Sequence, residues 1–128
     1  MLKYFLITAV FIIAGCNTPQ EILYLGEDNN GQSIELCQNE EIVISLSANI
    51  TTGYTWAVSC IDTNYLKQVS EVQYKSSSNK MGSTGEQTFR FQTIAVGQME
   101  LKLIYHRPWE KDIAPLDSFY IKITVVKD

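Results

Sequence analysis

Hydrophobic residues alternate with polar ones over most of the chain beyond residue 30. A period of two is typical of strands with one buried face, because successive side chains of a strand point to opposite sides of the sheet. The residues between the apolar positions are mostly polar or charged, so we expect each sheet to have one solvated side. The alternating apolar positions are Ile34 and Leu36; Ile42, Ile44 and Leu46; Tyr54, Trp56 and Val58; Phe89 and Phe91; Met99, Leu101, Leu103 and Tyr105; and Phe119, Ile121, Ile123 and Val125.

Clusters of turn-forming residues separate the alternating segments. They lie at residues 38–40, 49–53, 76–85, 95–97 and 107–115. No segment of ten or more residues after the N-terminal region shows a convincing apolar period of 3.6, so helices are not expected. Short strands at this spacing predict an all-β fold, an immunoglobulin-like antiparallel β-sandwich over residues 31–128. We expect Trp56, Phe89, Phe91 and Phe119 to anchor its core.

The first residues follow a different pattern, that of a signal peptide. Lys3 gives a short positive start, and a nearly continuous apolar run extends to Ala14. This run is shorter than the roughly 20 apolar residues that span a bilayer. Its end at Gly15 and Cys16 resembles a lipobox, in which the cysteine sulfur receives a diacylglyceryl group. The alternative is an uncleaved hydrophobic N-terminal helix.

The lipobox pattern predicts where the protein resides. Residues 1–15 are expected to form a lipoprotein signal peptide, and residues 16–30 a lipidated Cys16 with a polar tether. A multiply acylated cysteine holds a protein stably on a membrane, since each buried methylene contributes about 0.8 kcal/mol. We therefore expect an exported protein that is lipid-anchored to a bacterial membrane, on its periplasmic or cell-surface side.

Two further cysteines, Cys37 and Cys60, follow the lipobox cysteine. An even pair in an oxidising compartment favours a disulfide between them. The alternative is two buried free thiols that act as small hydrophobic side chains, because a bond requires the two Cα atoms within about 7 Å of each other.

Composition and charge exclude several classes of function. The 128 residues are 45% hydrophobic and 19% charged, which fits one globular domain, and the formal net charge of -4 offers no basic surface for nucleic acid. His106 is the only histidine, so a histidine-rich metal site is excluded. The carboxylates Glu40, Glu41 and Glu71 read as solvated charges. We expect neither a cofactor nor a metal, and no enzyme activity.

Three predicted loops have compositions that are unusual for simple connections. The first, 49–54, reads Asn-Ile-Thr-Thr-Gly-Tyr, with turn-forming residues around two adjacent threonines. The second, 81–89, is rich in small residues that let its backbone approach another surface closely. The third, 106–109, reads His-Arg-Pro-Trp directly after a strand.

In these loops the chain resembles the chagasin family, immunoglobulin-like inhibitors of papain-type cysteine peptidases. The family carries Asn-Pro-Thr-Thr-Gly-Tyr/Phe, Gly-x-Gly-Gly and Arg-Pro-Trp, in this order. The resemblance covers roughly residues 31–127, within the usual boundary error. The departures are Ile50, where the family has proline, and Thr84, where it has glycine. The matching residues are Asn49, Thr51, Thr52, Gly53 and Tyr54 in the first loop, Gly82 and Gly85 in the second, and Arg107, Pro108 and Trp109 in the third.

The resemblance implies a function and a set of binding residues. It implies that the three loops lie side by side and enter the active-site cleft of a papain-like peptidase, as a reversible, tight-binding inhibitor that is not cleaved. It places the threonines nearest the catalytic cysteine and histidine, and we expect Trp109 to be the main energetic anchor and the protein to be monomeric. The loss of proline at Ile50 is expected to leave the first loop less preorganised. The alternative is a lipid-anchored immunoglobulin-like module for adhesion or envelope assembly, without a peptidase target.

Overall fold

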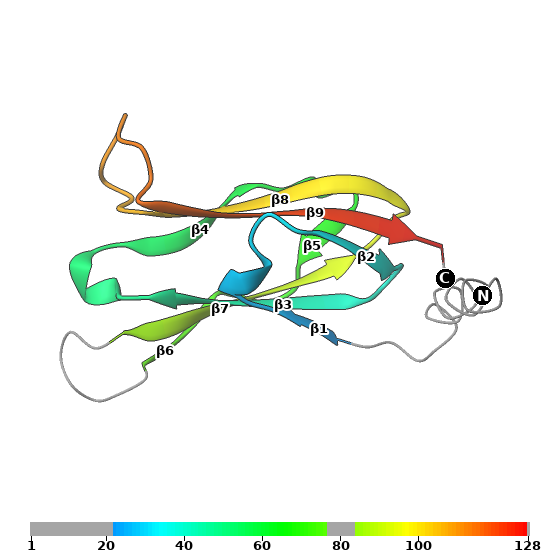
Figure 1. The fold of residues 1–128 in the computed structure, drawn as a ribbon, viewed down its shortest axis with the longest axis horizontal. Coiled ribbons are helices and arrows are strands. Elements are labelled where there is room, and N and C mark those ends of the chain that lie inside the picture. Colours follow the sequence, from blue (N-terminus) through cyan, green and yellow to red (C-terminus); the bar gives the residue numbers. More distant parts are fainter. Residues whose placement is uncertain (1–21, 77–83, 128) are drawn as a thin grey trace, which may run out of the picture.

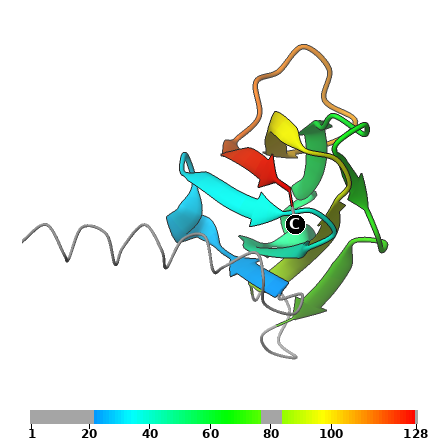
Figure 2. The ribbon, with the colours of Figure 1, turned by 90° about the vertical axis from the view of Figure 1, so that its right-hand side faces the viewer.

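The structure, a computed structural model, describes residues 22–76 and 84–127 and consists of two sheets packed face to face. Figure 1 shows the strands running along the length of the molecule, and Figure 2 shows the two layers from one end. The first sheet has the order β1-β3-β7-β5, with β6 also paired to β7, and the second has the order β2-β9-β8-β4. The strand bounds are β1 (Ile22–Leu25), β2 (Ser33–Cys37), β3 (Glu41–Ala48), β4 (Thr55–Cys60), β5 (Leu66–Gln68), β6 (Gln73–Ser76), β7 (Gly85–Thr93), β8 (Gly97–His106) and β9 (Asp117–Val126).

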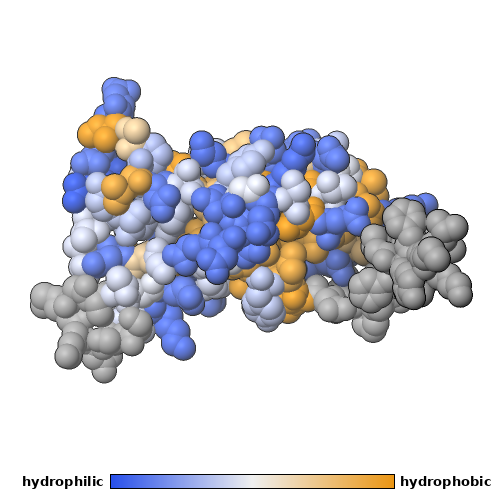
Figure 3. Space-filling view, in the orientation of Figure 1, coloured by the Kyte–Doolittle hydropathy of each residue, from blue (hydrophilic) through white to orange (hydrophobic). Residues whose placement is uncertain are grey.

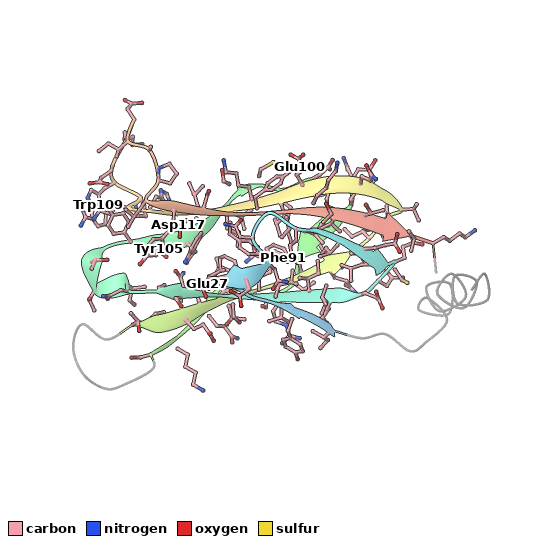
Figure 4. All side chains as sticks on the ribbon, in the orientation of Figure 1. Glu27, Phe91, Glu100, Tyr105, Trp109 and Asp117 are labelled. Carbon is pink, nitrogen blue, oxygen red and sulfur yellow. The ribbon has the colours of Figure 1, made fainter. Side chains whose placement is uncertain are left out.

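The architecture confirms the predicted all-β, immunoglobulin-like sandwich. In β7 and β9 every second side chain is buried, and Phe89, Phe91 and Phe119 are almost completely inaccessible to solvent between the sheets. Figure 4 shows Phe91 in this position. Trp56 is also buried, so all four predicted core anchors lie in the core. The alternation therefore indicates which side chains of each strand face the opposite sheet.

Two strand pairs are parallel, whereas the sequence predicted antiparallel pairing throughout. β1 runs parallel to β3, and β2 runs parallel to β9, while the remaining pairs are antiparallel. Both parallel strands lie at the edge of a sheet and come from the N-terminal part of the fold. In chain order, the first two strands are therefore edge strands, one in each sheet, and the central strands follow them.

The folded domain begins earlier than the sequence predicted. Residues 22–30 were expected to belong to the tether, but they form β1 and the short 3-10 helix η2 (Glu27–Asn29). Leu25 is only 7% exposed in the core, and the Glu27 carboxylate accepts a hydrogen bond of 3.1 Å from the backbone N–H of Ser47 in β3. The strand reads Ile-Leu-Tyr-Leu, four hydrophobic residues in a row, so it shows no period-two alternation by which it could be recognised.

The predicted disulfide between Cys37 and Cys60 is wrong, because Cys60 carries a free thiol and is exposed to solvent. Cys37 lies in β2 and Cys60 in β4, which are the opposite edges of one sheet with β9 and β8 between them. Three strand spacings separate such edges by about 14 Å, twice the largest Cα separation that a disulfide allows. Exposure also excludes the alternative of a buried thiol for Cys60. Strand order, which alternation does not reveal, decides this pairing.

Within residues 22–76 and 84–127, no helix has the length and hydropathy needed to cross a bilayer.

Replacing Leu25 by alanine tests whether β1 belongs to the folded domain. We expect Leu25→Ala to lower the free energy of unfolding by about 2 kcal/mol or more, because it leaves a cavity in the core. The matched control is Tyr24→Ala on the same strand, where the side chain is 70% exposed and the change should stay within about 0.5 kcal/mol. Urea unfolding of both variants gives the comparison. Equal stabilities would place residues 22–25 outside the cooperative unit.

Candidate functional site

The three loops singled out by the sequence start from one end of the sandwich. At this end Ala48 of β3 pairs with Gly85 of β7, and Gly85 pairs with Ser76 of β6. In the other sheet, Thr55 at the start of β4 pairs with His106 at the end of β8. Figure 1 shows the β3–β4 connection and the loop between β8 and β9 at this end, while β9 finishes at the other. The sheet registers therefore bring together segments that lie far apart in the chain.

The first loop is a 3-10 turn that is closed by its own side chains. Asn49 precedes the 3-10 helix η3 (Ile50–Thr52), and its Oδ1 accepts hydrogen bonds from the backbone N–H and the hydroxyl of Thr51. The Thr52 hydroxyl donates to the carbonyl oxygen of Asn49 at 2.7 Å. Gly53 ends the turn with a φ of 89°, in the left-handed region that glycine adopts without strain. Asparagine thus caps the turn, the threonine hydroxyls bond to that asparagine, and glycine supplies the left-handed backbone that ends the turn.

An aromatic cluster supports this loop from below. The ring of Tyr105 on β8 stacks on Tyr54 with centroids 5.4 Å apart and meets Trp56 at 5.1 Å. The Tyr105 hydroxyl also accepts a hydrogen bond of 2.9 Å from the backbone N–H of Asn49. One side chain of the second sheet thus fixes both ends of the turn that leaves the first sheet.

Trp56 and Gln87 connect the two sheets beneath the loops. The indole N–H of Trp56 donates to the carbonyl oxygen of Ser47 at 2.9 Å, and the backbone N–H of Trp56 donates to Oε1 of Gln87 at 2.8 Å. The Gln87 amide in turn donates to the Thr55 hydroxyl at 3.0 Å. Gln87 is 5% exposed, and a buried amide whose groups are all paired rigidifies its surroundings.

Arg107 joins the third loop to the first. Its Nε donates to the carbonyl oxygen of Thr52 at 3.1 Å, and its guanidinium carbon lies 4.4 Å from the centre of the Tyr54 ring. A second nitrogen forms an ion pair of 3.3 Å with Glu110, three residues further along the chain. Arg107 therefore joins the two loops by one hydrogen bond and one cation–ring contact.

Trp109 covers Gly53 and is still largely exposed. A methyl group at the α-carbon of Gly53 would collide with the indole ring of Trp109, so the two residues are in close contact. The Trp109 side chain nevertheless is 65% exposed, and the preceding Pro108 is exposed as well. Figure 4 shows Trp109 at the end of the molecule where the loops lie. The prediction that this tryptophan is presented on a loop is confirmed.

The second loop is described only at its base. Gly82 lies outside the described residues, and Thr84 is exposed. Gly85 was expected near the tip but is buried, and an added methyl group would collide with the Tyr74 ring and the Lys75 carbonyl oxygen of β6. Gly85 therefore has a structural role, because it allows β6 and its tyrosine to approach β7 closely, and its binding role stays a prediction.

The structure thus unites most of the predicted binding residues, and it adds supporting ones. Residues 49–54 and 107–109 form one continuous surface, which we call the loop surface. Tyr105 was missed as a contributor because alternation assigned it to a strand, and Gln87 because it was placed in the second loop without a role of its own. Their partners are groups of other strands, and no local motif indicates such contacts.

The loop surface protrudes, which is unlike a catalytic cleft. A cavity of about 590 Å³ does occur between β4 and β8, lined by residues that include Cys60, Asp62 and Glu100, but it lies at the far end of β4 from the loops. No group of three or more His, Cys, Asp or Glu side chains in the described ranges is placed to hold a metal ion.

Comparisons with known proteins agree with this geometry. The family model described as "Chagasin family peptidase inhibitor I42" matches residues 35–123. Amoebiasin-2 of Entamoeba histolytica is 28% identical over 116 residues, which cover 90% of this chain and 94% of that protein. Amoebiasin-1 of the same organism is 30% identical over 101 residues, 79% of this chain and 97% of that protein.

Solved structures give the same result. The crystal structure of the cysteine protease inhibitor EhICP2 from Entamoeba histolytica matches with a TM-score of 0.74 and 28% identity, covering 82% of this chain and 96% of that one. The structure of PbICP-C in complex with falcipain-2 matches with a TM-score of 0.56 at 19% identity, covering 83% and 99%, and supports the fold alone.

Replacing Gly53 by alanine tests the contact between the first and third loops. The matched control is Gly31→Ala, because Gly31 has a similar φ of 84° but no atom near an added methyl group. The control should cost about 1–2 kcal/mol in stability from the left-handed backbone alone. Gly53→Ala should cost more and shift the indole N–H resonance of Trp109. Equal costs in urea unfolding, with an unshifted resonance, would contradict the contact.

Proposed function

We propose that the loop surface of this chain, which belongs to the chagasin family of peptidase inhibitors, occludes the active-site groove of papain-like peptidases. As a member of that family, the protein is an inhibitor of cysteine peptidases and not an enzyme. The proposal is that inhibition is reversible, tight and competitive. The observation that carries it is the joining of Thr52, Gly53, Arg107 and Trp109 in one protruding surface.

The backbone of the first loop explains why such an inhibitor would resist cleavage. Hydrolysis requires a carbonyl oxygen to enter the oxyanion hole of the peptidase. The carbonyl of Asn49 accepts from the backbone N–H and hydroxyl of Thr52, and that of Ile50 accepts from the N–H of Gly53. The carbonyl of Thr52 accepts from Arg107. Three carbonyls of the turn are therefore engaged within the inhibitor, and the loop blocks the groove without the geometry of a substrate.

Rigidity of the loop surface favours tight binding. Ordering of flexible loops on association reduces affinity, and internal constraints present before binding avoid that cost. The Asn49 cap, the Tyr105 hydroxyl and the Arg107 bridge all act on the first loop before any partner arrives. We propose that they compensate for Ile50 in place of the family's proline.

The two threonines present a defined chemistry to the partner. Both hydroxyl hydrogens are donated inside the loop, to Asn49. The exposed threonine oxygens therefore remain as acceptors, beside methyl groups. Such a tip suits a groove that offers hydrogen-bond donors, as an active site with an imidazolium and an oxyanion hole does.

We also propose that the protein is exported and anchored by a lipid on Cys16, as a monomer. Cys16 lies outside the described residues, and this part of the proposal rests on the sequence. The fold adds one constraint: β1 begins at Ile22, so only five residues, 17–21, separate it from the anchor and reach at most about 18 Å. Ile22 pairs with Glu41, at the far end of β3 from the loop surface. The loop surface would then face away from the membrane.

Titration of papain with the full-length chain in detergent tests the inhibition. We expect competitive inhibition, with the chain uncleaved at residues 49–53 after prolonged incubation, as measured by mass spectrometry. Trp109→Ala should weaken inhibition by about thirtyfold or more, because a central tryptophan in an interface contributes about 2 kcal/mol or more. Tyr24→Ala, at the other end of the molecule, is the control for an exposed aromatic side chain.

The result against this proposal is also definite. Full papain activity at a large excess of the folded wild-type chain would exclude papain-like peptidases as the target class. Inhibition that persists unchanged in Trp109→Ala, with the fold intact, would show that the loop surface is not what enters the groove.

The anchor is tested by Cys16→Ala. We expect this variant to leave the membrane fraction or to keep its first 15 residues, whereas the wild-type chain should carry acyl groups on Cys16 in the mass spectrum. Cys60→Ala removes a free cysteine elsewhere in the chain and should leave fractionation unchanged. Normal processing and membrane partition of Cys16→Ala would contradict the lipid anchor.

A further inference from the structure

The second half of the loop between β8 and β9 carries exposed hydrophobic side chains that the fold does not require. Ile113 is 60% exposed and Leu116 is 64% exposed, and the intervening Ala114 and Pro115 are exposed too. Trp109 on the same loop is 65% exposed, so this loop carries three of the four most exposed large hydrophobic side chains in residues 22–76 and 84–127. Figure 3 shows hydrophobic residues standing among hydrophilic ones on the loop at the upper left.

This half of the loop is held in place at both ends. The backbone N–H of Leu116 donates to the carbonyl oxygen of Tyr105 at 2.9 Å, and that of Glu110 donates to Arg107 at 3.0 Å. Asp112 at the top of the loop has a φ of 62°, a left-handed turn that aspartate tolerates better than most residues. The two ends of this segment are therefore fixed, which limits the ordering that burial of its hydrophobic side chains would require.

We propose that Ile113 and Leu116 form a second contact with the peptidase, on an apolar part of its surface beside the groove that receives Trp109. This inference rests on the proposed function. The partner of this contact is the peptidase, because the loop is continuous with the loop surface. Arg107 joins the base of the loop to Thr52, so a protein that binds the threonines and Trp109 also meets this loop. The charged side chains of Lys111 and Asp112 at the top of the loop supply the polar rim that surrounds apolar contacts in interfaces.

The contact has a consequence for the range of targets. The groove is where papain-like peptidases share their chemistry, whereas the surface beside it is free to differ between them. Ile113 and Leu116 would therefore favour peptidases with an apolar rim and contribute little against those with a charged one.

The test is the double variant Ile113→Ser/Leu116→Ser in the full-length chain in detergent. We expect the inhibition constant for papain to rise by about tenfold or more. The ratio of the variant's constant to the wild-type constant should depend little on salt, because the variant loses apolar burial and not charge. Val96→Ser is the control, because Val96 is 51% exposed in the turn between β7 and β8, at the opposite end of the sandwich. Urea unfolding should show equal stability for all three chains. Amides of residues 113–116 should gain protection from hydrogen exchange when papain binds.

The outcomes separate this inference from the function on which it rests. Suppose that the wild-type chain inhibits papain and that Trp109→Ala weakens the inhibition, whereas the double variant inhibits as well as the wild type. The second contact is then wrong, and the proposed function stands. If the double variant changes only the sedimentation of the free chain, the hydrophobic surface pairs two copies and the inference is overturned. If the wild-type chain does not inhibit papain at all, both fail together.

Discussion

The loop surface depends above all on Tyr105, which joins the two sheets at the end where the loops leave. Its ring lies against Tyr54 and Trp56, and its hydroxyl accepts the N–H of Asn49, where the first loop begins. This contact fixes the start of the 3-10 turn, which leaves β3 of the first sheet, on the strand of the second sheet that leads into the Arg-Pro-Trp segment. Arg107 completes the arrangement by bonding the Thr52 carbonyl from two residues beyond Tyr105. The proposed activity therefore depends on a support that contacts no peptidase itself.

Internal hydrogen bonding also supports the proposal that the first loop would block a peptidase without being cleaved. A peptide that occupies a peptidase groove is cleaved when its carbonyls are free to be polarised. In this turn the carbonyls of Asn49, Ile50 and Thr52 accept hydrogen bonds from Thr52, Gly53 and Arg107. The same bonds fix the backbone at Ile50, where a proline would have restricted φ. Side-chain capping and a covalent ring are thus two solutions to one requirement, a turn that is ordered before it binds.

The fold separates two tasks between its two ends. The loops leave where Ala48 pairs with Gly85, and β1 enters where Ile22 pairs with Glu41. The strands between them are rigid, since their inward side chains interdigitate in one core. A protein anchored through its N-terminal residues would accordingly hold its binding end toward the aqueous phase, where a peptidase approaches.

The sequence by itself determined the all-β class, the core positions and the three loop motifs, because alternation and turn chemistry are local properties. Phe89, Phe91 and Phe119 were recognised for this reason, as was the exposed Trp109. Tertiary structure decided what local patterns do not contain. Strand order placed Cys37 and Cys60 at opposite edges of a sheet and so excluded their disulfide. Contacts with other strands gave Tyr105, Gln87 and the buried Gly85 their supporting roles. Pairing with β3 made a strand of residues 22–25, which show no alternation of their own. In each case the deciding contact joins residues distant in the chain, and their separation in space is fixed only when the sheets form.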